Sequence, residues 1–174
     1  KGRGVCPSCN ARRMVATAAH LTDYVLPDLP LRQWVLAVLK RLRYFLERDA
    51  DLQGTALHLF LRAVESCLRA HSPGSGPAAR LGAVAFIHRF GSTLNAHLHF
   101  HCVVIDGVFD SAAGGVVFHA ATGLDATAIT QVQVQVQAQV RRRLLRVFVR
   151  RGPLPRDDAQ AMAQWEHGGG FSVD

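Results

Sequence analysis

The sequence lacks long apolar runs and regularly spaced cysteines, and each absence excludes a class of protein. None of its 174 residues belongs to a run near the roughly 20 apolar residues that cross a membrane, and no signal-peptide pattern opens it. The four cysteines are irregularly spaced, which argues against a disulfide framework and indicates a reducing, cytoplasmic setting. With 49% hydrophobic residues, we expect one globular domain with a core and no membrane partner.

Lysine is also scarce. Of the 20 Lys and Arg, only Lys1 and Lys40 are lysines, and the 13 acidic residues leave a net charge of +7. Arginine holds phosphate with a planar fork of donors, so this bias favours a polyanionic partner such as DNA. A genomic preference for arginine codons, or a solvated helix face, would explain the same residues without any function. The residues that we expect to contact DNA are Arg12, Arg13, Arg41, Arg43 and the run Arg141, Arg142, Arg143, Arg146, Arg150 and Arg151.

Two helices are predicted in the first half of the chain. Apolar residues recur at helical spacing from Leu31 to about Arg48, with arginines and a lysine on the opposite face. A second amphipathic stretch predicts a helix over 55–70. The Ser-, Pro- and Gly-rich segment 72–77 then predicts a loop.

Strands are predicted after that loop. Residues 83–90 are apolar, Gly91-Ser92 is typical of a turn, and 97–106 alternates for ten residues. Asp106 is predicted to start a turn at Gly107. The glycines and valines of 107–118 predict further antiparallel pairing.

The last part of the chain has an ambiguous pattern. Residues 132–140 alternate valine with glutamine or alanine, as a strand would, yet apolar residues also recur at helical spacing over 124–151. The segment is much longer than the usual strand of about 4–8 residues, so we predict a helix. Residues 153–174 are predicted to form a loop-like tail. The whole pattern indicates an α+β fold, an antiparallel sheet with helices on one face, preceded by two helices.

Three histidines alternate along the second predicted strand. His97, His99 and His101 share one face, while Leu98 and Phe100 point to the other. Side chains two residues apart can converge on a metal ion whose bonds to nitrogen are about 2 Å. A single histidine on a strand is usually a surface residue, but three on one face favour a metal site.

The residues around these histidines resemble those of a known family. Arg89-Phe90-Gly91-Ser92 precedes them and Asp106-Gly107-Val108-Phe109 follows them. This segment resembles the rolling-circle insertion-sequence transposases of the HUH endonuclease superfamily, which are two-tyrosine enzymes. Residues 26–27, 32–35 and 41–44 also resemble this family, so the likeness covers most of 5–151.

The resemblance implies an HUH fold with an RRM/ferredoxin-like core and a DNA-nicking activity. It implies that His99 and His101 bind a divalent metal, Mg²⁺ or Mn²⁺, with His97 and His88 as second-rank candidates. The substrate would be single-stranded DNA or the hairpin ends of a mobile element, attacked by a tyrosine with help from the metal. Such a protein would be nucleoid-associated in a bacterial cytoplasm.

The tyrosines depart from the family pattern. The family carries a tyrosine pair on a helix downstream of the histidines, whereas the two tyrosines here, Tyr24 and Tyr44, both lie upstream. We therefore expect a fragment that ends before the catalytic helix and is inactive by itself. The expected organisation is a remnant of a zinc-binding module at 1–20, a partial catalytic domain at 21–151, and a tail at 152–174.

The pair Cys6-x-x-Cys9 has the spacing of half a zinc knuckle. In the family such a pair belongs to an N-terminal module that holds a structural Zn²⁺. Cys67 and Cys102 are predicted to be buried thiols.

Two other functions remain open from the sequence. One is a non-catalytic nucleic-acid-binding module with an RRM-like sheet, which would need stacking aromatics on the sheet face where this chain has histidines. The other is a small metal-binding protein without a role on DNA. The arginine bias and the family pattern both count against that second possibility.

Overall fold

The structure is a computed structural model that describes residues 7–90, 96–166 and 171–174. The chain divides into two compact units, Lys1–Pro30 and Leu31–Asp174. The first unit contains α1 (Pro7–His20) and a π-helical turn, η1 (Leu21–Val25). The described side chains of both elements are largely exposed, Tyr24 being 81% exposed. This unit therefore has no buried core of its own among the residues described.

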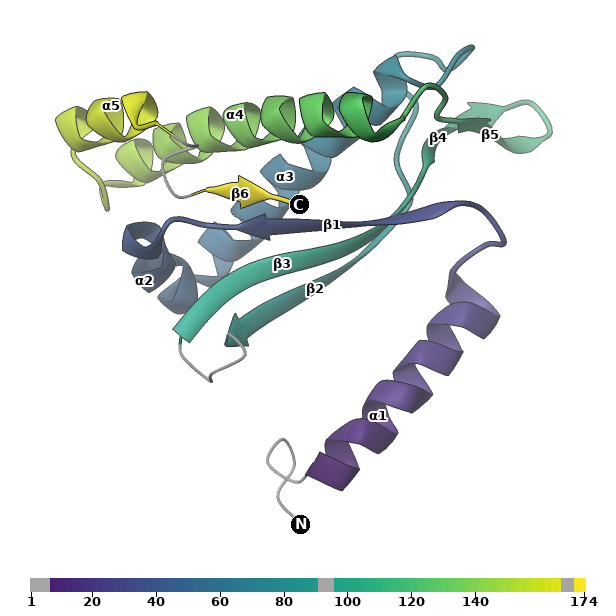
Figure 1. The fold of residues 1–174 in the computed structure, drawn as a ribbon, viewed down its shortest axis with the longest axis horizontal. Helices are drawn as coiled ribbons and strands as arrows, with labels where there is room; N and C mark the ends of the chain where they lie inside the picture. The colour runs from purple at the N-terminus through teal and green to yellow at the C-terminus, as the bar shows by residue number, and fades with distance from the viewer. Residues whose placement is uncertain (1–6, 91–95, 167–170) are drawn as a thin grey trace. The chain divides into compact units, whose positions relative to one another are not determined.

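The second unit contains a four-stranded sheet. Its strands are β1 (Leu31–Ala37), β2 (Ala83–Phe90), β3 (Ala96–Ile105) and β6 (Ser172–Val173). They are arranged in the order β2-β3-β1-β6, and every neighbouring pair is antiparallel (Figure 1). A separate hairpin is formed by β4 (Gly107–Ala112) and β5 (Gly115–Ala120). The long β3 lies between β1 and β2, so side chains from all three strands meet on each face.

The helices of this unit pack against one face of the sheet. They are α2 (Lys40–Arg48), α3 (Ala50–Ala70), α4 (Ala126–Arg151) and α5 (Arg156–Gln164). The side chains of Asp49 and Asp125 accept hydrogen bonds from backbone N–H groups and so cap the N-termini of α3 and α4. The predicted α+β class, with helices on one face of an antiparallel sheet, is confirmed. No helix in the described part of the chain is both long and apolar enough to cross a membrane.

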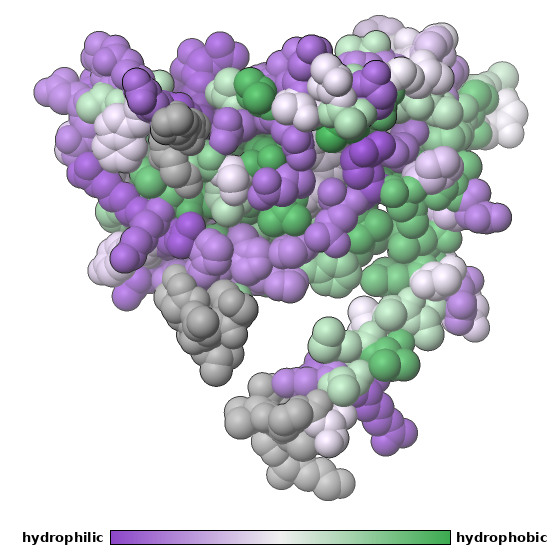
Figure 2. All heavy atoms as spheres, in the orientation of Figure 1, coloured by the Kyte–Doolittle hydropathy of each residue, from purple (hydrophilic) through white to green (hydrophobic). Residues whose placement is uncertain are grey.

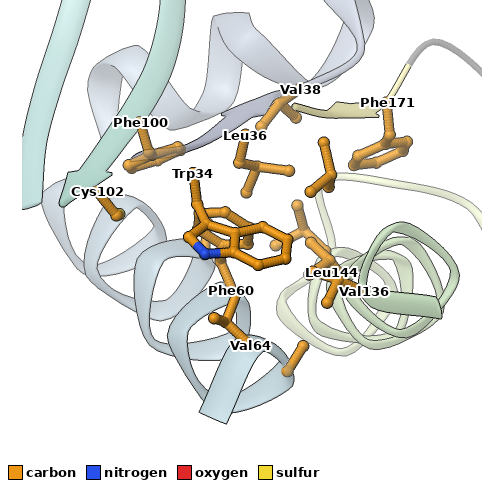
Figure 3. Packing of buried hydrophobic residues seen from close by; sticks show 14 of the residues in the cluster. Trp34, Leu36, Val38, Phe60, Val64, Phe100, Cys102, Val136, Leu144 and Phe171 are labelled. Carbon is orange, nitrogen blue, oxygen red and sulfur yellow. The ribbon is translucent and has the colours of Figure 1, made fainter. Parts of the chain in front are cut away.

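The core lies between the sheet and the two long helices. Trp34 and Leu36 from β1, and Phe100 from β3, are at most 1% exposed and point toward Phe60 of α3 and Leu144 of α4 (Figure 3). Every second residue of β1 and β3 is used in this way. The residues between them therefore face away from the helices, and these include His97, His99 and His101.

The helix predicted from Leu31 is wrong in its first half. Residues 31–37 form β1, and α2 begins only at Lys40. Trp34, Leu36 and Val38 are buried alternately, so the segment also satisfies the two-residue period of a strand. Pairing with β3 on one side and β6 on the other decides between the two periods. The second predicted helix is confirmed as α3, although it begins at Ala50.

The tail was also predicted wrongly. Residues 153–174 contain α5 and β6, and Met162 and Phe171 are buried at 1% and 3% exposure. Short elements of this kind are held by their tertiary contacts and leave little periodicity in the sequence.

The predicted long helix and the predicted strands are confirmed where the structure describes them. Residues 126–151 form α4, and the two predicted strands form β2 and β3. The chain bends at Asp106 before β4, but the carboxylate of Asp106 pairs with both donor groups of Arg32, at 2.9 and 3.1 Å, rather than closing a local turn. The predicted turn at Gly91-Ser92 lies outside the described residues.

Candidate metal centre

The histidine cluster is created by the pairing of β2 with β3. In this register His88 lies opposite His99, and Phe86 lies opposite His101. Residues directly opposite each other in antiparallel strands place their side chains on the same face. His88 therefore joins His99 and His101 on the face that the helices leave open. In Figure 2, hydrophilic residues gather over β2 and β3 on this side, with hydrophobic residues beside them.

The three imidazoles lie close enough to share an ion. The ligand atoms of His88, His99 and His101 are all within 4.8 Å of one another. The ring centroid of His88 is 5.1 Å from that of His99 and 4.5 Å from that of His101. Nitrogens that share one metal with bonds of about 2 Å lie about 3–4 Å apart. Small rotations of the side chains would therefore bring all three rings into a coordinating arrangement.

The surroundings keep His101 in the form that binds metals. Burial lowers the pKa of His101, and the neighbouring charges of His88 and His99 lower it further. A lowered pKa favours the neutral ring, and only the neutral ring has a nitrogen lone pair to offer.

A backbone contact selects the nitrogen that His99 can offer. Its Nδ1 lies 2.7 Å from the carbonyl oxygen of His97. A carbonyl oxygen only accepts hydrogen bonds, so Nδ1 must carry the proton. The lone pair of His99 is then on Nε2. Such an outer hydrogen bond is a common feature of metal-binding histidines.

His101 has a comparable contact with a side chain of β1. The amide of Gln33 reaches its Nδ1 at 3.2 Å, through the atom placed as Nε2. If that atom donates, Nδ1 holds the lone pair and Nε2 holds the proton. A half-turn of the amide places Oε1 there instead, and His101 then donates from Nδ1 and frees Nε2. Gln33 can therefore support either form of the ring.

His97 is placed differently from the other three histidines. Its ring stacks on that of His99 with centroids 4.9 Å apart, but it lies outside the group whose ligand atoms converge. Burial, the charge of Arg43 and then that of His99 lower the pKa of His97. Of the two second-rank histidines, the structure thus brings His88 to the pair His99 and His101, whereas His97 contributes its backbone carbonyl.

The arginines predicted to contact DNA are not equivalent. Arg41 forms an ion pair with Asp158, and Arg43 donates from Nε to the carbonyl of Val38 at 2.6 Å. Arg141 donates to the carbonyls of Met162 and Trp165 at the end of α5. Arg12, Arg13, Arg41 and Arg142 are exposed, while Arg143 is half-buried.

The two tyrosines are both exposed. Tyr24 lies in η1, and Tyr44 lies on α2, 56% exposed. The guanidinium carbon of Arg48 lies 3.8 Å from the centroid of the Tyr44 ring, a cation–π contact that accounts for the position of that ring.

The structure tests the predictions for two of the four cysteines. Cys67 and Cys102 are buried thiols, as predicted, and burial raises the pKa of Cys102 to about 11. Cys6 lies outside the described residues, and Cys9 belongs to α1.

Sequence reasoning missed three residues on this face. The sequence pattern predicts a helix for Gln33 and Val35, and it does not distinguish Phe86 from the other residues of its strand. Once β1 is known to be a strand, its alternation places Gln33 and Val35 on the open face. Val35 and Phe86 both lie opposite His101, one on each side. The half-buried rings and methyl groups there form an apolar margin next to the imidazoles.

The fold and the cluster define an α+β protein in which three histidines converge on one face of an antiparallel sheet. Residues 82–174, just over half of the chain, match the family model described as "Putative transposase". The chain therefore belongs to this transposase family, and a transposase family suggests DNA as the partner. The match includes β2 and β3 and hence the whole histidine cluster. No curated protein and no solved structure matches the chain.

Proposed function

We propose that His88, His99 and His101 hold a divalent metal that serves the nicking of single-stranded DNA, a reaction for which a tyrosine nucleophile must be supplied from elsewhere than Tyr24 and Tyr44. The observation that carries this proposal is the convergence of three imidazoles from two strands, with ligand atoms within 4.8 Å, on the face of the sheet opposite α3 and α4. An open face admits a polymer, whereas an enclosed cavity would not. The contact of His99 with the His97 carbonyl supports the same use, because it leaves Nε2 free.

The ligand set favours Mn²⁺ over Mg²⁺. Imidazole nitrogen suits transition metals, whereas Mg²⁺ prefers oxygen ligands and retains its waters. Three protein ligands leave further coordination positions for phosphate oxygens, and the bound ion would supply Lewis-acid activation of the scissile phosphate.

The residues around the cluster would position the DNA. Phe86 and Val35 flank His101 and give nucleobases an apolar surface on which to lie. Arg43 is near enough for its charge to lower the pKa of His97, so it can attract a phosphate to that end of the histidine row. The exposed ring surface of Phe86 is also the observation that best supports the alternative function, a nucleic-acid-binding module without catalysis.

We assign the attacking hydroxyl to neither tyrosine. The family resemblance implies a tyrosine nucleophile downstream of the histidines, whereas Tyr24 and Tyr44 lie upstream, and one face of the Tyr44 ring is stacked against Arg48. The chain would then bind DNA and metal without forming a covalent adduct. A phosphotyrosine adduct after incubation with Mn²⁺ and single-stranded DNA, seen on a denaturing gel, would contradict this assignment.

Calorimetric titration with Mn²⁺ tests the metal site. Loss of an outer hydrogen bond to a metal ligand typically costs about 10–100-fold in affinity, so loss of a ligand should cost at least as much. We expect His88→Ala, His99→Ala and His101→Ala each to weaken binding by at least about tenfold. His97→Ala keeps the backbone carbonyl and should have a much smaller effect.

An exposed histidine on α3, His58, provides the matched control, and His58→Ala should bind Mn²⁺ like the unchanged protein. Unchanged affinity in both the His99 and the His101 variants would refute the metal site. Unchanged affinity in the His88 variant alone would remove β2 from the ligand set and return the site to a histidine pair.

A further inference from the structure

A second arginine-rich surface lies away from the histidine cluster. A groove of about 640 Å³ runs between α4 and α5, which pack side by side (Figure 1). Arg142, Arg146 and Arg150 line it from α4, and Arg156 lines it from α5. No acidic residue lines the groove. The surface therefore has four positive charges and no neutralising partner within its own walls.

These four arginines have no structural task among the residues described. None of them forms a hydrogen bond or an ion pair there, and all four are exposed. Their neighbours on the same helices differ: Arg141 holds the end of α5, and Arg151 faces Asp49 at 3.7 Å. The arginines that stabilise the fold are thus distinct from those that line the groove.

The spacing of the arginines suits a regularly charged polymer. Arg142, Arg146 and Arg150 are four residues apart, so they share a face of α4 at intervals of about 6 Å. A strand of B-form DNA carries one phosphate for about every 3.4 Å of its axis, so the row covers about four phosphates. Arginine can hold each phosphate through two N–H groups.

The floor of the groove favours a single strand over a duplex. Leu145, Val149 and Ala163 lie between the arginines, and the lining is mainly apolar. A duplex presents only sugars and phosphates to such a surface, since its bases are stacked inside. A single strand can lay the faces of its bases on apolar side chains while its phosphates meet the arginines.

We propose that the groove between α4 and α5 binds a single-stranded segment of DNA, as a site separate from the histidine cluster. This inference rests on the proposed function in taking DNA as the polymer. The helices cover one face of the sheet and the histidines occupy the other, so a strand in the groove is not in contact with the metal ligands. The transposase would in this way hold two segments of DNA at once.

Fluorescence anisotropy with a labelled oligothymidylate of about 16 nucleotides tests the site. In the 174-residue chain, the triple change Arg142→Gln, Arg146→Gln, Arg150→Gln should weaken binding by at least tenfold. Each lost phosphate contact removes about 0.7 from the slope of log affinity against log salt for single strands, so this slope should fall by about 2. Ala163→Glu, which adds an acid to the floor and removes no arginine, should weaken binding in the same direction.

Matched controls separate the groove from general charge. The double change Arg48→Gln, Arg151→Gln neutralises arginines outside the groove and should leave the slope within about one contact, roughly 0.7, of its original value. A triple variant that binds oligothymidylate like the unchanged protein would overturn the inference. So would equal weakening by the control pair, or groove-dependent binding of an acidic peptide but not of DNA. Equal losses for a duplex of the same length would overturn the assignment to single strands.

The proposals for the metal site and for the groove can be refuted independently of each other. Without metal, the control variant His58→Ala should bind the oligothymidylate as the unchanged protein does, because His58 does not line the groove. Groove variants should in turn keep their affinity for Mn²⁺. Loss of Mn²⁺ binding only in the histidine variants, with no effect of the groove variants on DNA, would leave the proposed function standing and remove the second site.

Discussion

Single hydrogen bonds decide which nitrogen of each histidine can reach a metal. The backbone carbonyl of His97 settles the matter for His99, since only a protonated Nδ1 can pair with it. For His101 the partner is Gln33, whose amide can turn either its oxygen or its nitrogen toward the ring. The two histidines of the pair are therefore oriented by different means, one by the main chain and one by a side chain that can be changed.

Substitution of Gln33 tests this difference. Gln33→Glu offers only acceptors to Nδ1 of His101, fixes the proton there and should keep or raise the affinity for Mn²⁺. Gln33→Leu removes the contact and should lower the affinity for Mn²⁺ severalfold. Loss of an outer hydrogen bond to a metal ligand typically costs about 10–100-fold in affinity, and we expect the lower end of this range because Gln33 is exposed. Titration calorimetry measures both variants, and equal affinities for Leu and Glu would show that the contact has no part in metal binding.

At the same scale, the sequence predicts part of the cluster but not all of it. Alternation along one strand is enough to place His99 and His101 on one face, because the two-residue period is a local property. His88 belongs to another strand, and its position opposite His99 depends on the register of β2 with β3. Register is set by long-range packing of the whole sheet. For that reason the sequence ranks His88 below His99 and His101, and it gives no sign that Gln33 lies beside them.

Two segments of the sequence fit both the 3.6-residue period of a helix and the two-residue period of a strand. One of them forms a strand in the structure, and the other forms a helix. Residues 31–37 form a strand because β3 and β6 pair with both of their edges. Residues 132–140 alternate valine with glutamine or alanine, yet they form part of α4, whose length of 26 residues far exceeds that of a strand. Segment length therefore predicted the second case correctly, whereas pairing partners distant in sequence determined the first.

Two valines of α4 offer a direct test that residues 132–140 form a helix. Val134 is 60% exposed and Val136 is fully buried, although a strand would place both on the same face. Val136→Ala should destabilise the fold by about 2 kcal/mol through the cavity it leaves. Val134→Ala should leave stability unchanged or raise it by up to about 0.5 kcal/mol, because alanine is the better helix former. Urea unfolding compares them, and equal losses would contradict the helix.

For the whole molecule, the core shows which residues form one cooperative unit. Every residue of the buried hydrophobic cluster lies between Trp34 and Val173. The cluster includes Leu154, Met162 and Phe171, which belong to the segment predicted from sequence to be a tail. Neither 21 nor 151 is therefore a boundary of this core. A sequence pattern could not reveal this, because the tail is joined to the core by a two-residue strand and a short helix.

Two deletions test the extent of that unit. A chain of residues 31–174 keeps the whole cluster, so it should unfold within about 0.5 kcal/mol of the full chain, the range of an ordinary surface change. It should also bind Mn²⁺ with the same affinity, since the three histidines and Gln33 are all retained. A chain of residues 1–151 loses β6, α5 and five buried apolar side chains, and at about 2–5 kcal/mol for each large one it should not fold stably. Urea unfolding and Mn²⁺ titration of both chains provide the measurements. If 1–151 unfolded cooperatively at the midpoint of the full chain, the tail would be dispensable and the two-residue strand would contribute nothing to the sheet.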